Sequence, residues 1–174
     1  MEIGQFQIYT GDGKGKTTAA LGLALRASGA GLRVFFGQFI KQGEYSEIKA
    51  LRRLPNVDVA QFGSGKGLLV HRAPEAVDLA CAREGLARLR EALISGDYDV
   101  VIADEINCAA TCGLLEEADL LALAACRPEG VELVFTGRGA TPAVLERADL
   151  ITEMTPVRHY YRTKNLPARE GIEY

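Results

Sequence analysis

Three closely spaced glycines, followed by a lysine and two threonines, carry the clearest chemistry in this sequence. Residues 9–20 read Y-T-G-D-G-K-G-K-T-T-A-A, after a β-branched and aromatic run and before an apolar stretch with helical spacing. Glycines at 11, 13 and 15 lack a Cβ, so successive backbone N–H groups can turn inward around an anion. A helix that starts near Lys16 adds its positive N-terminal end. The pattern predicts a loop that wraps a polyphosphate.

This phosphate loop departs from the strict pattern G-x-x-x-x-G-K-[ST], because Thr10 stands where the first glycine belongs. The sequence G-K-T-T at a predicted helix start is specific, so a modified loop is favoured over a glycine turn with two exposed lysines. Lys16 can reach the β- and γ-phosphates, and the Thr17 hydroxyl can bind Mg²⁺. The candidate nucleotide-binding residues of the loop are Gly11, Asp12, Gly13, Lys14, Gly15, Lys16, Thr17 and Thr18.

Two carboxylates follow a second apolar run. Residues 99–105 read D-V-V-I-A-D-E, so Asp104 and Glu105 come directly after four apolar residues. At the end of a parallel strand they would lie beside the phosphate loop, where either one can hold Mg²⁺ directly or through water. The alternative is that Asp104 only caps the following turn.

Two arginines and one loop are further candidates. Arg138 lies in T-G-R-G after another apolar run and can pair either with a phosphate or with a carboxylate from the C-terminal tail. Arg26 falls near the end of the predicted loop helix, as a nucleotide contact or a solvated surface residue. Residues 38–41, Q-F-I-K, are expected either to line a pocket or to form a loop with a partly buried Phe39.

The four cysteines are expected to be buried, reduced thiols. Cys108 and Cys112 are four residues apart and can share a helix face, which leaves a metal site as the alternative. No C-x-x-C occurs, and only His71 and His159 are available as further ligands. Thiols in apolar or helical surroundings usually pack as small hydrophobic groups.

The elements that position these residues alternate between extended and helical patterns. We predict strands at 5–10, 33–38, 57–62, 99–104, 131–136 and 150–154, and helices at 16–28, 43–54, 74–94, 116–125 and 142–148. Strands that read as continuous apolar runs between helices indicate a parallel sheet covered on both faces. The helix at 74–94 has an apolar side made of Val77, Ala80, Cys81, Leu86, Leu89 and Leu93. Residues 155–174 have no regular period and form either a mobile tail or a lid.

Composition favours one soluble domain over residues 1–174. The net charge of −3 argues against broad nucleic-acid binding. No apolar run reaches the ~18 residues of a membrane span, and no signal pattern opens the chain, so we expect a cytoplasmic protein without a membrane partner.

The site by itself leaves several triphosphate chemistries open. A signalling GTPase should carry an N-K-x-D motif that recognises guanine, and no such tetrapeptide occurs. An ATPase would use Glu105 to orient a water molecule, whereas a small-molecule kinase would need a base for an acceptor hydroxyl. Neither of these two classes is excluded by the residues alone.

Seven segments in order resemble the P-loop type of ATP:corrinoid adenosyltransferase. They are the loop at 9–20, Q-F-I-K, D-V-V-I-A-D-E-I-N (99–107), G-L-L (113–115), R-P-E-G-V-E-L-V-F-T-G-R-G-A (127–140), A-D-L-I-T-E-M (148–154) and A-R-E-G-I-E-Y (168–174). The resemblance covers essentially the whole chain and implies a single-domain P-loop NTPase-like (RecA-like) α/β fold. The Thr10 departure also matches the loop of that family.

The resemblance implies transfer of the 5′-deoxyadenosyl group of ATP to a Co(I) corrinoid, with release of inorganic triphosphate. Lys16, Thr17 and Glu105 become the catalytic residues, and Thr17 with Glu105 or Asp104 becomes the Mg²⁺ site. Arg26 becomes a nucleotide contact. The implied partners are cob(I)alamin or a corrinoid precursor, a flavoprotein-like electron donor and a second copy of the chain in a homodimer.

Two departures concern the corrinoid side. Some family members carry a Phe and a Trp after a glycine turn that matches residues 63–67, whereas this chain continues Lys66-Gly67-Leu68-Leu69 and contains no Trp. The usual H-P-Y near the C-terminus reads H-Y-Y at 159–161. If the missing aromatics help to remove the lower cobalt ligand, this chain must do so otherwise or prefer a precursor without that ligand.

Overall fold

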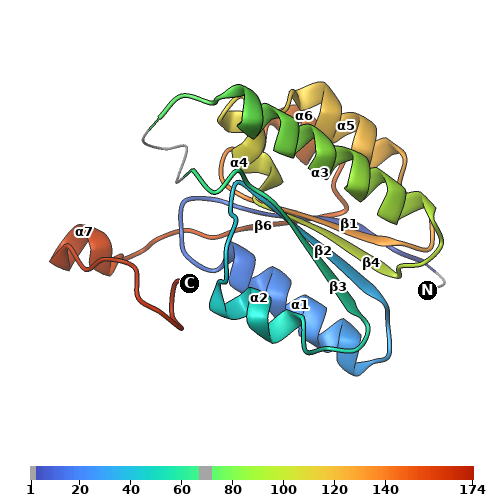
Figure 1. Ribbon diagram of the computed structural model, residues 1–174, viewed down its shortest axis with the longest axis horizontal. Helices are drawn as coiled ribbons and strands as arrows, with labels where there is room; N and C mark the ends of the chain where they lie inside the picture. Colours follow the sequence, from blue (N-terminus) through green and yellow to red (C-terminus); the bar gives the residue numbers. More distant parts are fainter. Residues whose placement is uncertain (1–2, 67–71) are drawn as a thin grey trace.

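Six strands form one all-parallel sheet, which sets the arrangement of the chain (Figure 1). The computed structural model describes residues 3–66 and 72–174. Across the sheet the strand order is β3-β2-β4-β5-β1-β6. The strands are β1 (Phe6–Thr10), β2 (Val34–Phe39), β3 (Val57–Phe62), β4 (Val100–Asp104), β5 (Glu132–Thr136) and β6 (Leu150–Glu153).

Helices cover both faces of this sheet, as the apolar strands predicted (Figure 1). One face carries α1 (Lys16–Gly29) and α2 (Ser46–Leu51). The other carries α3 (Ala76–Ile94), α4 (Ile106–Thr111), α5 (Glu117–Ala125) and α6 (Pro142–Leu145), while α7 (Tyr160–Lys164) lies apart in the tail. Among the described residues, no helix combines the length and apolarity that crossing a membrane requires.

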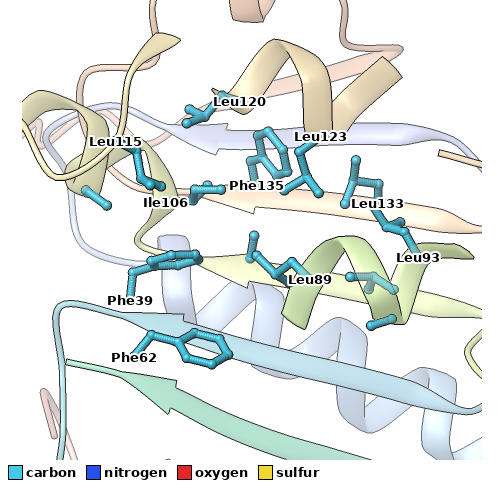
Figure 2. Packing of buried hydrophobic residues seen from close by; sticks show 14 of the residues in the cluster. Phe39, Phe62, Leu89, Leu93, Ile106, Leu115, Leu120, Leu123, Leu133 and Phe135 are labelled. Carbon is cyan, nitrogen blue, oxygen red and sulfur yellow. The ribbon is translucent and has the colours of Figure 1, made fainter. Parts of the chain in front are cut away.

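Successive side chains along each strand point to opposite faces of the sheet and so contribute to two separate hydrophobic cores. All six residues of β2 are buried. Phe35 and Phe39 pack with α3 to α6, whereas Val34 and Phe36 pack with α1 and α2. In the first core Phe135 of β5 lies beneath Leu120 and Leu123 of α5 (Figure 2). Both sheet faces are thus closed, and only the strand ends are left to form a site.

Close packing of α3 on the sheet depends on a glycine. Phe39 and Phe62 lie side by side, with ring centroids 5.5 Å apart (Figure 2). A Cβ on Gly85 would come within 2.6 Å of the Phe62 ring and 2.9 Å of the Phe39 ring. The buried side of α3 therefore includes Gly85 and Leu89. The predicted apolar side of this helix is partly wrong, because the Val77 side chain is 39% exposed.

The predicted α/β fold is confirmed, with strand ends within one residue and helix ends within three residues of the prediction. Two helices were missed. The helix α4 has six residues and directly follows the predicted strand end, and α7 has five residues inside the segment predicted to be irregular. Such short helices contain too few turns to produce a periodic apolar pattern.

The order of the strands shows how the two halves of the predicted site meet. Because all strands are parallel, the loop after β1 and the end of β4 lie at the same edge of the sheet. However, β5 lies between β1 and β4, so Asp104 is not on the strand next to the phosphate loop. Thr136, the last residue of β5, pairs with Tyr9 of β1 and stands between the two halves of the site.

Candidate nucleotide site

The phosphate loop connects β1 to α1, and its glycines are needed for two different reasons. Gly11 and Gly15 have φ values of +91° and +124°, which side chains rarely adopt. A Cβ on Gly13 would lie 2.5 Å from the carbonyl oxygen of Met154. Thr10 still belongs to β1, and its carbonyl accepts a 2.8 Å hydrogen bond from the Met154 N–H. The position without a glycine is therefore a strand residue.

Lys16 is the first residue of α1 and lies almost completely inside the loop. It is 8% exposed, and its Nζ donates hydrogen bonds of 2.7 Å to the carbonyls of both Gly11 and Gly13. Burial lowers the pKa of Lys16, and the neighbouring Arg138 guanidinium lowers it further. Thr17 and Thr18 follow on α1, and together with Lys16 they line a cavity beside the loop. The structure thus brings the central loop residues together.

The two carboxylates at the end of β4 have different surroundings. Asp104 is fully buried, and its two oxygens accept hydrogen bonds from Gln38 Nε2 (3.0 Å) and Thr136 Oγ1 (2.7 Å). Glu105 has a left-handed backbone (φ 60°, ψ 18°) and lines the cavity. Its N–H donates to the same Thr136 hydroxyl at 2.9 Å. Glu105 therefore lines the cavity together with Thr17. Asp104 is buried behind it and is linked to its backbone through the Thr136 hydroxyl.

The cations around the loop have partners in this structure. Arg138 lines the cavity, its Nη2 donates to the carbonyl of Asp12 at 3.3 Å, and its Nε lies 3.9 Å from the Asp12 carboxylate. The tail carboxylate Glu173 instead pairs with Lys14 at 3.3 Å. A phosphate and a tail carboxylate were the two partners predicted for Arg138. The tail carboxylate Glu173 pairs with Lys14 and not with Arg138.

The structure does not bring Arg26 to the cavity. Arg26 is exposed in the last turn of α1, ten positions after Lys16. With a rise of ~1.5 Å per residue, this separation corresponds to ~15 Å along the helix. Gly11 and Asp12 belong to the loop but do not line the cavity, whereas residues 13–18 do.

The cavity itself has a volume of about 710 Å³, in the usual range for small-molecule sites. The phosphate loop forms one side and the C-terminal tail another. Phe39 is fully buried rather than partly so, and Ile40 and Lys41 line the cavity instead. Lining residues that the sequence did not point to are Leu21, Ser46, Glu47 and Thr111. Tyr160 and residues 171–174 also line the cavity, and they belong to the tail for which a lid was one of the two predictions.

Cys108 and Cys112 also line this cavity, and none of the four cysteines is fully buried. All four are free thiols. Burial raises the pKa of Cys108 to about 12, and nearby Glu105 adds to this effect. No cluster of three or more potential metal-ligating side chains occurs within residues 3–66 and 72–174. His71 and residues 67–69 of the glycine turn lie outside the described residues.

Comparisons with known proteins cover nearly the entire chain. The family model described as ATP:corrinoid adenosyltransferase BtuR/CobO/CobP matches residues 2–174. A corrinoid adenosyltransferase of Pseudomonas aeruginosa is 34% identical, over 99% of this chain and 85% of that protein. Corrinoid adenosyltransferases of Escherichia coli K12 and of Salmonella typhimurium are each 31% identical, over 99% of this chain and 87% of theirs. This chain therefore belongs to the ATP:corrinoid adenosyltransferase family.

Proposed function

We propose that this protein transfers the 5′-deoxyadenosyl group of ATP to the Co(I) centre of a corrinoid and releases inorganic triphosphate. The observation that carries the proposal is a phosphate loop opening onto a nucleotide-sized cavity, in a chain that matches the family from residue 2 to residue 174. The ATPase and small-molecule kinase alternatives share the loop but have no comparable support from the rest of the chain.

The residues of the site suit this reaction. Reduced cobalt is the nucleophile and has no proton to lose, so the reaction needs no general base. It needs an in-line approach to C5′ and neutralisation of charge on the leaving triphosphate. Lys16, Lys14 and the N–H groups of the loop supply positive charge on the phosphate side. Arg138 lines the same cavity and adds a further cation.

Mg²⁺ fits the oxygen donors that face this cavity. The Thr17 hydroxyl and the Glu105 carboxylate come from different elements and line one space, and both are hard oxygen ligands. These two residues would hold the ion, which would neutralise charge on the phosphates. The Thr136 hydroxyl is hydrogen-bonded both to the backbone N–H of Glu105 and to the carboxylate of Asp104. Thr136 and Asp104 therefore help to orient Glu105.

The proposed partners follow from family membership. They are cob(I)alamin or a corrinoid precursor, a flavoprotein-like electron donor and a second copy of the chain, all in the cytoplasm. Sedimentation at working concentration tests the homodimer, because a monomer there would contradict it.

An anaerobic assay with MgATP and chemically reduced cob(I)alamin tests the reaction. We expect the corrinoid spectrum to change to that of adenosylcobalamin and the phosphate product to be intact triphosphate. ADP and phosphate with an unchanged corrinoid would instead identify an ATPase or kinase. The matched control is the Lys16→Ala variant, which should give neither product.

A further inference from the structure

The C-terminal tail reaches the phosphate loop through a single side chain. After β6 the chain runs out to α7 and then returns, so that the C-terminus lies close to α1 and α2 (Figure 1). Lys14 Nζ donates a 2.5 Å hydrogen bond to the carbonyl of Ile172 and lies 3.3 Å from Glu173 Oε1. Within the described part of the chain, these are the only hydrogen bonds or ion pairs that join residues 155–174 to the rest.

Glu173 is held in place by its own segment. Arg169 donates to it from its backbone N–H at 2.8 Å and from its guanidinium at 3.3 Å, and the Tyr160 hydroxyl donates to the same carboxylate. The Arg169 guanidinium also lies over the Tyr160 ring, 5.1 Å from its centroid. These contacts keep the pKa of Glu173 low, at about 2. The tail therefore presents a preassembled anion to the phosphate loop.

Apart from this contact, little burial holds the tail to the body. No residue of α7 is buried, and Ile172 and Tyr174 are 54% and 45% exposed. The side chains of Lys14 and Glu173 are 39% and 18% exposed. An ion pair at the surface that is only partly buried, as here, is weak enough for a ligand to replace it.

We propose that Glu173 competes with the nucleotide phosphates for Lys14, so that binding of triphosphate releases the tail and return of Glu173 favours release of triphosphate. Lys14 belongs to the loop that cradles the phosphates, and it is the residue that Glu173 neutralises. A triphosphate in the loop would place several negative charges near Glu173, and like charges at close range repel. Glu173 is thus a positioning residue that acts through Lys14.

The role in product release rests on the proposed function, whereas the competition for Lys14 does not. By linkage, two anions that compete for one cation weaken each other's binding by the same factor. If Glu173 weakens triphosphate binding, then triphosphate must loosen the tail. The two effects can be measured separately, without a corrinoid.

Binding of inorganic triphosphate is measured by calorimetry for the wild type, Glu173→Gln and Tyr160→Phe. We expect Glu173→Gln to bind between about 1.5-fold and fivefold more tightly, the range for an exposed ion pair. Tyr160→Phe should shift the affinity in the same direction by less, since it removes one donor to Glu173. Glu170→Gln is the matched control, because it changes the same charge in an exposed residue of the same segment, and it should bind like the wild type.

Hydrogen exchange of residues 160–174 is the second measurement. Inorganic triphosphate should speed exchange there in the wild type, and Glu173→Gln should exchange fast with or without it. Weaker or unchanged triphosphate binding by Glu173→Gln, or slower tail exchange on adding triphosphate, would overturn the proposal. A protein that binds triphosphate as expected but forms no adenosylcobalamin would contradict the proposed function and leave this competition intact.

Discussion

Replacing Thr136 with valine tests whether one hydroxyl organises the second half of the site. Thr136 is fully buried at the end of β5. Its Oγ1 donates to Asp104 Oδ1 at 2.7 Å and accepts from the Glu105 N–H at 2.9 Å. Valine has nearly the same shape but no hydroxyl. The Thr136→Val variant therefore leaves one buried acceptor and one backbone donor without partners, while the packing is preserved.

The two lost hydrogen bonds set the expected loss of stability. A bond to a charged group contributes about 1.5–3 kcal/mol, and a neutral bond contributes about 1 kcal/mol. We therefore expect Thr136→Val to lower the free energy of unfolding by about 2.5–4 kcal/mol. Thr136→Ser keeps the hydroxyl and loses one buried methyl group, which costs about 1 kcal/mol.

Urea unfolding of the wild type and both variants measures this difference, provided that the slope with denaturant stays constant. Thr136→Ser should lie between the wild type and Thr136→Val. The reasoning is refuted if Thr136→Val loses less than about 1 kcal/mol, or if Thr136→Ser is destabilised as much as Thr136→Val. Because Glu105 faces the cavity, Thr136→Val should also raise the Mg²⁺ concentration needed for activity.

Three further predictions concern the cavity. Lys16→Ala should abolish MgATP-dependent adenosyl transfer with an unchanged circular dichroism spectrum, and near-normal turnover would contradict the assignment of the phosphate loop. Glu105→Gln should retain some transfer at high Mg²⁺, because no general base is needed, so total loss of activity with normal MgATP binding would show that the carboxylate has another role. Since its pKa of about 12 leaves about a thousandfold less thiolate than the ordinary value of 9.0, Cys108 should react slowly with iodoacetamide at pH 8 and faster only as the pH approaches 12. Mass spectrometry of the labelled peptide measures that rate, and labelling at the rate of a small-molecule thiol would contradict the prediction.

Local patterns were sufficient to predict most of the architecture and the loop. The strand, glycine loop and helix at residues 6–29 depend on conformational preferences of residues that are neighbours in the chain. The sheet buried on both faces was also predictable, because a strand covered on both sides is a continuous apolar run of neighbouring residues. The distance of Arg26 from the loop was also available from helix geometry, since ten residues of helix span ~15 Å.

Which of the adjacent residues Asp104 and Glu105 faces the cavity could not be predicted from the local sequence. It depends on Thr136, which lies 31 residues from Glu105 and 32 from Asp104 in the sequence and reaches both from β5. The insertion of β5 between β1 and β4 is a property of the sheet order. Sequence patterns record which residues are apolar or flexible, but not which strands become neighbours.

By itself, the sequence determined the parallel α/β fold, the glycine-rich loop between β1 and α1 and the pair of carboxylates at the end of β4, because each depends on residues close together in the chain. Only the tertiary structure decided that Glu105 faces the cavity, that Arg138 lies against Asp12 and that Lys14 holds Glu173. Lys14 and Glu173 are 159 residues apart. Partners at such separations are selected by packing and by the competition of charges in the folded chain, and no local pattern encodes that competition.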